Sequence, residues 1–167
     1  VVAEDTNFYS HHGFDVKGIL RAFLTNLKNQ SRSQGGSTIT QQLVKNAILT
    51  PDKTIERKIK EIILSWQIEN KFSKDEILQM YLNEIPYGSN IYGIEAAAES
   101  FFNKSAKDLS LAESALLASL PKAPTYYSPY GSHTGELYGR QQKIINNLFV
   151  YSICYICSFR ISLVFVW

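Results

Sequence analysis

The sequence predicts a mainly α-helical fold, a single helical domain with little or no sheet. Apolar residues recur at helical spacing in several segments. Several of these segments begin with a hydroxyl residue followed three positions later by Glu or Gln, the pattern of a capping box. Few segments alternate apolar and polar residues with the period of two that indicates a half-buried strand. A composition of 45% hydrophobic and 19% charged residues over 167 positions suits one domain with a single core.

Three helices are expected in the first half of the chain. The first follows Asp15 and carries an apolar stripe, which consists of Val16, Ile19, Leu20, Phe23, Leu24 and Leu27. The second begins at Thr38, which forms a capping box with Gln41. The third follows Thr54, and its apolar stripe consists of Ile55, Ile59, Ile62, Ile63 and Trp66.

The second half of the chain offers two more capping boxes. Ser73 pairs with Glu76 and Ser110 pairs with Glu113, and each pair leads into an apolar run. Pro121 should end the last of these helices. Between the helices, residues 86–90 read as a turn and residues 123–131 as an aromatic-rich loop.

The two ends of the chain differ from the helical segments between them. Because the chain begins at Val1 without an initiator methionine or signal-like segment, we expect a piece of a longer protein whose anchor lies outside it. Residues 151–167 turn abruptly apolar. A membrane segment there would carry Arg160 at a cost of about 2.5–3.5 kcal/mol, and a buried strand is another option. We favour an end that does not belong to the domain, and therefore predict a domain over residues 1–149 and a tail of doubtful origin over residues 150–167.

Charge and cysteine content exclude some functions. A formal net charge of +2 argues against nucleic acid as the main partner, because that role needs a strong basic excess on one face. Cys154 and Cys157 form one CxxC, which suits a redox pair or half a zinc site. No second pair completes it, so we favour a structural role and predict no metal site.

The segment that starts with Gly35, Gly36, Ser37 and Thr38 is suited to hold an anion. Glycines let the backbone approach a ligand closely, and the start of a helix presents unpaired N–H groups. Cations follow at Lys45, Lys53, Arg57, Lys58 and Lys60, before a carboxylate at Glu61. The pattern predicts a phosphorylated or pyrophosphorylated substrate. Whether Ser37 and Thr38 only cap the helix or also contact the ligand stays open, since capping alone explains both residue types. Lys60 is more easily explained as part of a solvated helix face.

The N-terminal segment places Glu4 and Asp5 ahead of Phe8 and His11. Such a group could be a metal site, a general base with an orienting partner, or a surface helix cap. His11 is more simply explained as a hydrogen-bonding residue that fixes this first loop.

Taken in order, several motifs resemble those of the peptidoglycan glycosyltransferases, glycosyltransferase family 51. They are Glu4-Asp5 with Phe8, His11 and Gly13; GGSTITQQ; Arg57-Lys58 with Glu61; ILQMYLNEIPYG; and the run from Ala96 to Pro124. This family includes the transglycosylase domain of class A penicillin-binding proteins and the monofunctional transglycosylases. The resemblance runs from about residue 2 to residue 149, and several motifs in the right order are far more specific than any one of them.

The resemblance implies a lysozyme-like helical lobe at the outer face of a bacterial cell membrane, which polymerises lipid II into glycan strands. Glu4 then matches the general base that deprotonates the 4-hydroxyl of the acceptor sugar, and the reaction inverts the anomeric carbon. Glu61 matches a second catalytic acid, which organises the pyrophosphate site. The matching substrate-binding residues are Lys45, Lys53, Arg57, Lys58 and Gln42, with Ser37 and Thr38 as further candidates. Phe8 and Tyr9 offer Glu4 apolar surroundings.

The partners implied are lipid II, the lipid-linked nascent glycan, the membrane surface and inhibitors of the moenomycin type. No obligatory cofactor is implied, although Mg²⁺ or Mn²⁺ assists some family members. Two other functions stay open on the residues alone. A lysozyme-type glycan hydrolase shares the lobe and an essential Glu, but it has no use for a cation cluster. A non-catalytic scaffold that binds cell-wall precursors needs no general base.

Overall fold

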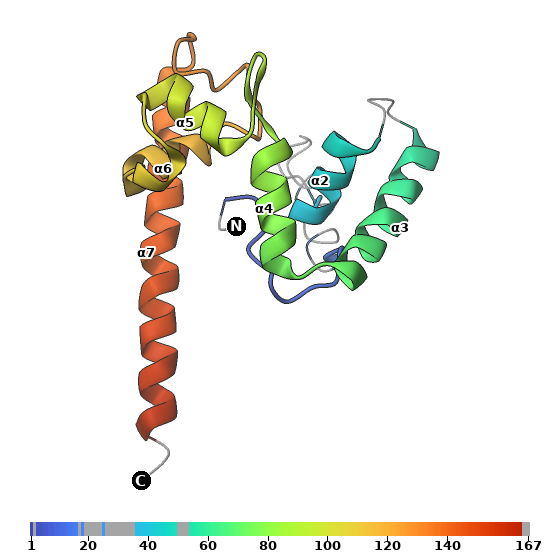
Figure 1. Cartoon of the computed structure of the whole chain (residues 1–167). Helices are drawn as coiled ribbons and strands as arrows, with labels where there is room; N and C mark the ends of the chain where they lie inside the picture. Colours follow the sequence, from blue (N-terminus) through green and yellow to red (C-terminus); the bar gives the residue numbers. More distant parts are fainter. Residues whose placement is uncertain (2, 17, 19–24, 26–35, 50–53, 165–167) are drawn as a thin grey trace. The chain divides into compact units, whose positions relative to one another are not determined.

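The protein is mainly helical, as the sequence predicts (Figure 1). The computed structural model describes residues 1, 3–16, 18, 25, 36–49 and 54–164. The chain divides into two compact units, which meet in the sequence between Ile85 and Pro86. The stripe predicted after Asp15 lies mostly outside the described residues, as does Lys53.

The first unit contains three helices, α2 (Ile39–Ala47), α3 (Ile55–Lys71) and α4 (Lys74–Glu84). Helix α2 packs against both α3 and α4. Its buried apolar residues and those of α4 build a core with Phe8 of the first loop; the fully buried members include Ile39, Val44, Ile77 and Ile85. Burying apolar area of this kind is the main stabilising contribution to the unit.

The predicted capping boxes are confirmed. Thr38 accepts a hydrogen bond from the backbone N–H of Gln41, and the Gln41 side chain accepts one from the N–H of Thr38, both at 3.2 Å. Ser73 with Glu76 opens α4 in the same way, and Ser110 with Glu113 opens a helix of the second unit. These pairs satisfy N–H groups that a helix start leaves unbonded, which explains why the boundaries were readable from sequence.

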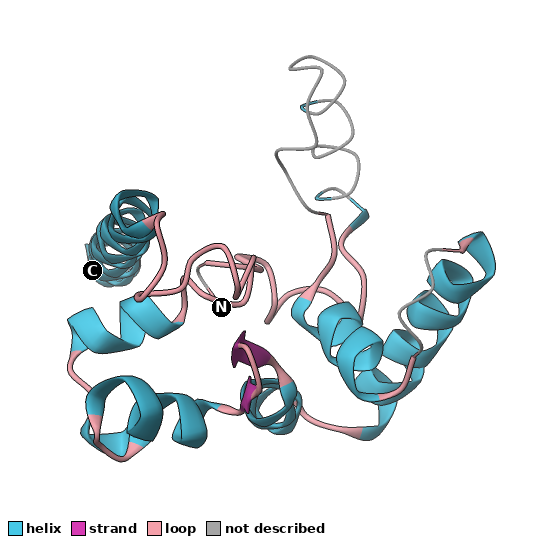
Figure 2. Ribbon diagram, turned by 90° about the horizontal axis from the view of Figure 1, so that it is seen from above, coloured by secondary structure: helices cyan, strands magenta, loops and turns pink. Residues whose placement is uncertain are grey.

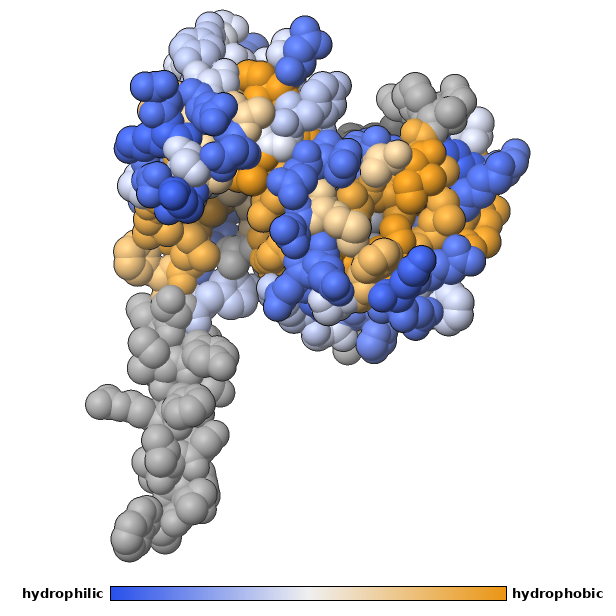
Figure 3. Space-filling view, in the orientation of Figure 1, coloured by the Kyte–Doolittle hydropathy of each residue, from blue (hydrophilic) through white to orange (hydrophobic). Residues whose placement is uncertain are grey.

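Helix α3 forms where its apolar spacing predicts, but its stripe does not face the core. Four large apolar side chains are more than half exposed, namely Ile55 (83%), Ile59 (53%), Ile63 (51%) and Trp66 (52%). Figure 3 shows hydrophobic residues gathered over this helix. An apolar stripe at this spacing normally packs inward. We refer to these four residues as the α3 ridge.

A buried charge network braces the first unit. Glu69 of α3, whose side chain is 3% exposed, pairs with Lys74 at 2.5 Å and accepts a hydrogen bond from Thr40 of α2. Lys74 also donates to the backbone carbonyl of His11 at 2.6 Å, and its ammonium lies 4.6 Å from the ring centroid of Phe8. One lysine at the start of α4 therefore holds α3 and the first loop at once.

The second unit begins with a short antiparallel hairpin of β1 (Pro86–Gly88) and β2 (Ile91–Tyr92), drawn in magenta in Figure 2. Between the strands, Asn90 adopts a positive φ of 64°, a turn conformation that Asn tolerates better than most residues. The turn predicted at residues 86–90 is confined to residues 89 and 90, because residues 86–88 form β1.

Three short helical elements and a long helix follow, namely α5 (Ile94–Phe102), the 3₁₀ helix η1 (Ala106–Asp108), α6 (Leu111–Leu117) and α7 (Thr134–Val164). Helix α6 ends earlier than Pro121 predicts, because the chain tightens into i to i+3 hydrogen bonds at Ser119 and Leu120. Residues 123–131 form the expected loop, without helix or strand.

Helix α7 continues through residue 150, the predicted start of the tail. The option of a buried strand is therefore wrong for the part of the tail that the structure describes, whereas the division at residue 149 stays a prediction. Among the described helices, none combines the length and the hydrophobicity needed to cross a bilayer.

Candidate functional site

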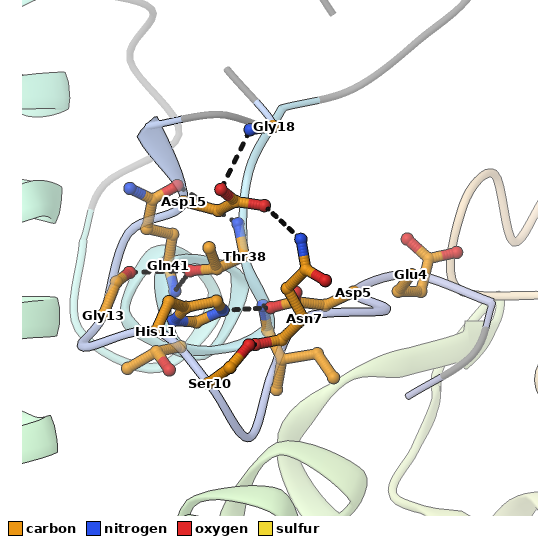
Figure 4. A network of polar contacts seen from close by, with 12 residues as sticks. Glu4, Asp5, Asn7, Ser10, His11, Gly13, Asp15, Gly18, Thr38 and Gln41 are labelled. Atoms are coloured by element: carbon orange, nitrogen blue, oxygen red, sulfur yellow. Dashed lines mark hydrogen bonds and ion pairs between the residues drawn. The ribbon is translucent and has the colours of Figure 1, made fainter. Parts of the chain in front are cut away.

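The loop that carries Glu4 is fixed to the start of α2 by Asp5. The Asp5 side chain is buried, and its Oδ2 lies 3.0 Å from the backbone N–H of Ile39 and 2.8 Å from Nε2 of His11 (Figure 4). A carboxylate at this position caps the helix and complements its dipole. The predicted role of His11 as a fixing residue is confirmed by this contact.

A second tie joins the same loop to the same helix. The hydroxyl of Thr38 donates to the carbonyl of Gly13 at 2.8 Å. Gly13 has a φ of +86°, and a Cβ there would meet the backbone of Ser65 at 3.0 Å, so both the conformation and the space require glycine. Because Thr38 accepts from Gln41 and donates to Gly13, its buried hydroxyl is engaged on both sides.

Glu4 lies beside this network and contacts α2 through Gln42. Figure 4 shows its carboxylate directed away from the Asp5–His11 pair. The Gln42 side chain donates to Oε2 of Glu4 at 3.4 Å, and the hydroxyl of Tyr81, from α4, donates to Oε1 of Gln42 at 3.4 Å. Both bonds are at the long end of the range for hydrogen bonds.

Glu61 lies on α3 with its side chain only 2% exposed, and two cations accompany it. The ammonium of Lys58 donates to Oε1 of Glu61 and, at 3.1 Å, to the hydroxyl of Ser37. Arg57 Nη1 lies 3.7 Å from Oε2 of Glu61. A buried carboxylate is stable only when charges and donors of this kind surround it.

Donors remain on the guanidinium of Arg57. Its side chain is 16% exposed, and its Nε and Nη1 are buried and make no hydrogen bond with the residues that the structure describes. A buried donor without an acceptor is costly, whereas an anionic oxygen would satisfy it. Together with the half-exposed Lys58, Arg57 therefore forms a cationic pair suited to a phosphate group.

The structure gathers most of the predicted site residues around the first turns of α2. Glu4 reaches Gln42, and Glu61 reaches Ser37 through Lys58. Lys45 is exposed in the last turn of α2, three residues beyond Gln42 and so on a neighbouring part of the helix surface.

Other expectations for the site need correction or extension. Tyr9 does not enclose Glu4 as expected; it is 60% exposed, and its hydroxyl donates to Asp75 of α4 at 3.1 Å. Sequence reasoning missed the contact between Tyr81 and Gln42. Tyr81 lies in the matched motif ILQMYLNEIPYG, which marks it as a candidate, but no local sequence pattern predicts its contact with α2. Within the described ranges, no three His, Cys, Asp or Glu side chains gather as metal ligands.

Comparison with known proteins agrees with the motifs. A sequence profile of the transglycosylase family matches residues 1–149. The chain is 50% identical over 129 residues to penicillin-binding protein 1F of Bacillus subtilis, covering 77% of the chain and 18% of that protein. It is 53% identical over 127 residues to penicillin-binding protein 1A of Pseudomonas aeruginosa, covering 76% of the chain and 16% of that protein.

A third relative matches a longer part of the chain. Penicillin-binding protein 1A of Rickettsia typhi is 45% identical over 152 residues, which is 89% of the chain and 19% of that protein. The chain thus spans less than a fifth of the length of these relatives. The profile match covers most of the chain, and the motifs agree with it in order and content. The chain therefore belongs to the transglycosylase family, the peptidoglycan glycosyltransferases.

Proposed function

We propose that the chain polymerises lipid II into peptidoglycan glycan strands. The 4-hydroxyl of the acceptor sugar attacks the anomeric carbon of the lipid-linked growing chain. The new glycosidic bond forms with inversion, while the bond to the pyrophosphate breaks and undecaprenyl pyrophosphate leaves. Family membership supports glycosyl transfer, and the contacts around α2 support the roles below.

Glu4 acts as the general base in this proposal. An alcohol is too weakly acidic to attack unaided, and a positioned base contributes roughly 10²–10⁴ in rate. Glu4 is half-buried, and it is held by Gln42 while its neighbour Asp5 fixes the loop. These contacts support a carboxylate that keeps one position throughout the reaction.

Arg57 and Lys58 stabilise the departing pyrophosphate. Negative charge grows on it as the bond breaks, and fixed cations with free N–H groups stabilise such charge most strongly in a partly dry site. Glu61 holds the two cations, and Ser37 holds Lys58 from the α2 side. We assign Lys45 and Lys53 to the same substrate by family resemblance, and Thr38 to support of Ser37.

One observation carries the proposal: both candidate carboxylates are tied to the same end of α2. Glu4 is tied through Gln42, and Glu61 through Lys58 and Ser37. Ser37 precedes the helix, and Gln42 lies in its first turn, which rises only about 5.4 Å. A base and a leaving-group site this close along one helix suit a single sugar carbon between them.

The membrane surface at the outer face of a bacterial cell is the proposed place of action. A polyprenyl-linked substrate resides in lipid, so the site has to work beside a bilayer. The α3 ridge presents three isoleucines and a tryptophan to solvent on the helix that carries Arg57 and Glu61. Trp is favoured at membrane interfaces, and an apolar helix face of this kind lies readily in the headgroup region.

Labelled lipid II in detergent, with products separated on a gel, tests the proposal. The parental protein should produce a ladder of glycan strands, and Glu4→Gln should reduce the rate by roughly 10²-fold or more. Glu56→Gln is the matched control, because Glu56 is an exposed carboxylate of α3 that pairs with Lys60; its rate should stay parental.

Two results would replace the proposal with another function. Cleavage of purified glycan strands without polymer growth would indicate a lysozyme-type hydrolase. Binding of lipid II by the parental protein without any turnover would indicate a precursor-binding scaffold. A parental rate in Glu4→Gln would remove Glu4 from the role of base.

A further inference from the structure

We infer that Tyr81 is a positioning residue that holds the Gln42 side-chain amide in place and, through this amide, holds Glu4. The inference rests on the proposed function, since it assigns a role in the same site. It starts from a chain of contacts across three segments: Tyr81 on α4, Gln42 on α2 and Glu4 in the first loop.

The chemistry of the three groups permits one arrangement of the amide. An ionised carboxylate only accepts hydrogen bonds, so Glu4 requires the NH₂ end of Gln42. In that orientation the carbonyl end of the amide faces Tyr81, whose hydroxyl donates to Oε1. If the amide turned over, its oxygen would face the carboxylate and that contact would become repulsive, whereas the Tyr81 hydroxyl can also accept a hydrogen bond and would not oppose the turn. Glu4 therefore selects the orientation of the amide, and the Tyr81 hydroxyl holds the amide in that place.

Burial makes Tyr81 suited to this task. Tyr81 is only 4% exposed. It lies on α4, whose start is fixed by a capping box and by the contacts of Lys74. Gln42, in contrast, is half-buried and has a flexible side chain. A rigid aromatic residue next to a flexible amide therefore supplies the order that the amide lacks. A Gln side chain held in one rotamer no longer pays the entropy of ordering when substrate arrives.

Steady-state kinetics of glycan synthesis on Tyr81→Phe tests this role. The variant keeps the ring and removes the hydroxyl, so its packing and melting temperature should change little. We expect kcat to fall about three- to tenfold, in line with the loss of one neutral hydrogen bond, with KM for lipid II within about twofold. Tyr87→Phe is the matched control, because Tyr87 is a second buried tyrosine, on β1, and should retain parental kinetics.

A double-mutant cycle separates positioning from general structural support. In a Gln42→Leu background, Tyr81→Phe should have no further effect on kcat, because the amide that Tyr81 holds is gone. Parental kcat in Tyr81→Phe, or an equal loss in both backgrounds, would overturn the inference. If Tyr81→Phe lowers the melting temperature strongly, the cycle still decides, since only coupled losses support positioning.

The failure of this inference differs from failure of the proposed function. A parental protein that makes no glycan from lipid II would overturn the function, and the role of Tyr81 with it. A parental protein that makes glycan beside an equally active Tyr81→Phe would overturn the role of Tyr81 alone.

Discussion

Lys58 of α3 donates a 3.1 Å hydrogen bond to the hydroxyl of Ser37, twenty-one residues earlier in the chain, while the same ammonium pairs with the buried Glu61. The contact fastens α3 to the residue that precedes the capping residue of α2. One side chain thus serves the packing of two helices and supplies a positive charge beside the guanidinium of Arg57. Substitutions at Lys58 should therefore affect chemistry and, more weakly, stability.

Lys58→Met should reduce the rate of glycan synthesis by roughly 10- to 100-fold, because a charge-assisted hydrogen bond to the leaving group contributes about 1.5–3 kcal/mol. Lys60→Met is the control, since Lys60 is exposed and pairs only with the exposed Glu56 among the described residues. Initial rates with labelled lipid II provide the measurement. Equal rates in the two variants would contradict a role for Lys58 at the leaving group.

Moenomycin, a phosphoglycolipid, should raise the melting temperature of the parental protein, because a ligand that binds only the folded state stabilises it. The shift should shrink in Lys58→Met and persist in Lys60→Met. Thermal denaturation with excess inhibitor measures both. An unchanged melting temperature in the parental protein would argue against inhibitor binding at this site.

Asp5→Ala should lower the free energy of unfolding by about 2–3 kcal/mol, since it removes the cap on Ile39 and leaves the buried His11 without its carboxylate. Asp108→Ala is the control; Asp108 is an exposed residue of η1, and a change within about 0.5 kcal/mol is expected. Urea denaturation of both variants provides the comparison. A similar loss in both would show that the contacts of Asp5 with Ile39 and His11 add no more stability than an exposed carboxylate does.

Gly13→Ala should destabilise the fold by about 1–3 kcal/mol, because alanine is strained at φ +86° and its Cβ would press on the backbone of Ser65. Gly139→Ala, inside α7 with open space around the added Cβ, should instead be neutral or stabilise by up to about 1 kcal/mol. Chemical denaturation measures both. Stability losses of the same size would show that the left-handed conformation at Gly13 is not the cause.

Glu113 should titrate far below an ordinary glutamate. The hydrogen bond from Lys104, followed by those from Ser110, lowers the pKa of Glu113 from 4.5 to about 2. Because the folded pKa is the lower one, the stabilising contribution is complete above pH 4.5 and is lost as the pH falls toward 2. Lys104→Met should raise this pKa toward 4.5, as measured by NMR titration of the carboxyl carbon. Lys107→Met should leave it near 2, and a shift of equal size there would contradict the assignment to Lys104.

The parts of the structure that the sequence predicts are those that depend on neighbouring residues. A capping box needs only four consecutive positions, so Thr38, Ser73 and Ser110 mark helix starts correctly. The motif order also identifies the family that the profile match shows. Helix α5 was not predicted as a separate element, because its start at Gly93 has no side-chain cap.

Sequence patterns did not predict contacts between residues that lie far apart in the chain. Periodicity showed that the α3 ridge is apolar, but period alone does not decide which face of a helix is covered. The Tyr81–Gln42 bond joins positions 39 residues apart, and Thr40 meets Glu69 across 29 residues. The roles of Glu4, Glu61 and the lysines were predicted from motif resemblance.

The contacts of Lys74 with Glu69 and His11 affect how the first unit opens. The first loop cannot detach from α4 without breaking the Lys74 contact to His11, and this ammonium also neutralises the buried Glu69 that Thr40 binds. If Lys74 moved with the loop, Glu69 would be left buried without its cation. Amide hydrogens of the first loop, α2 and the start of α4 should consequently exchange with solvent deuterium in one concerted event, as a single foldon, rather than in sequence from the N-terminus.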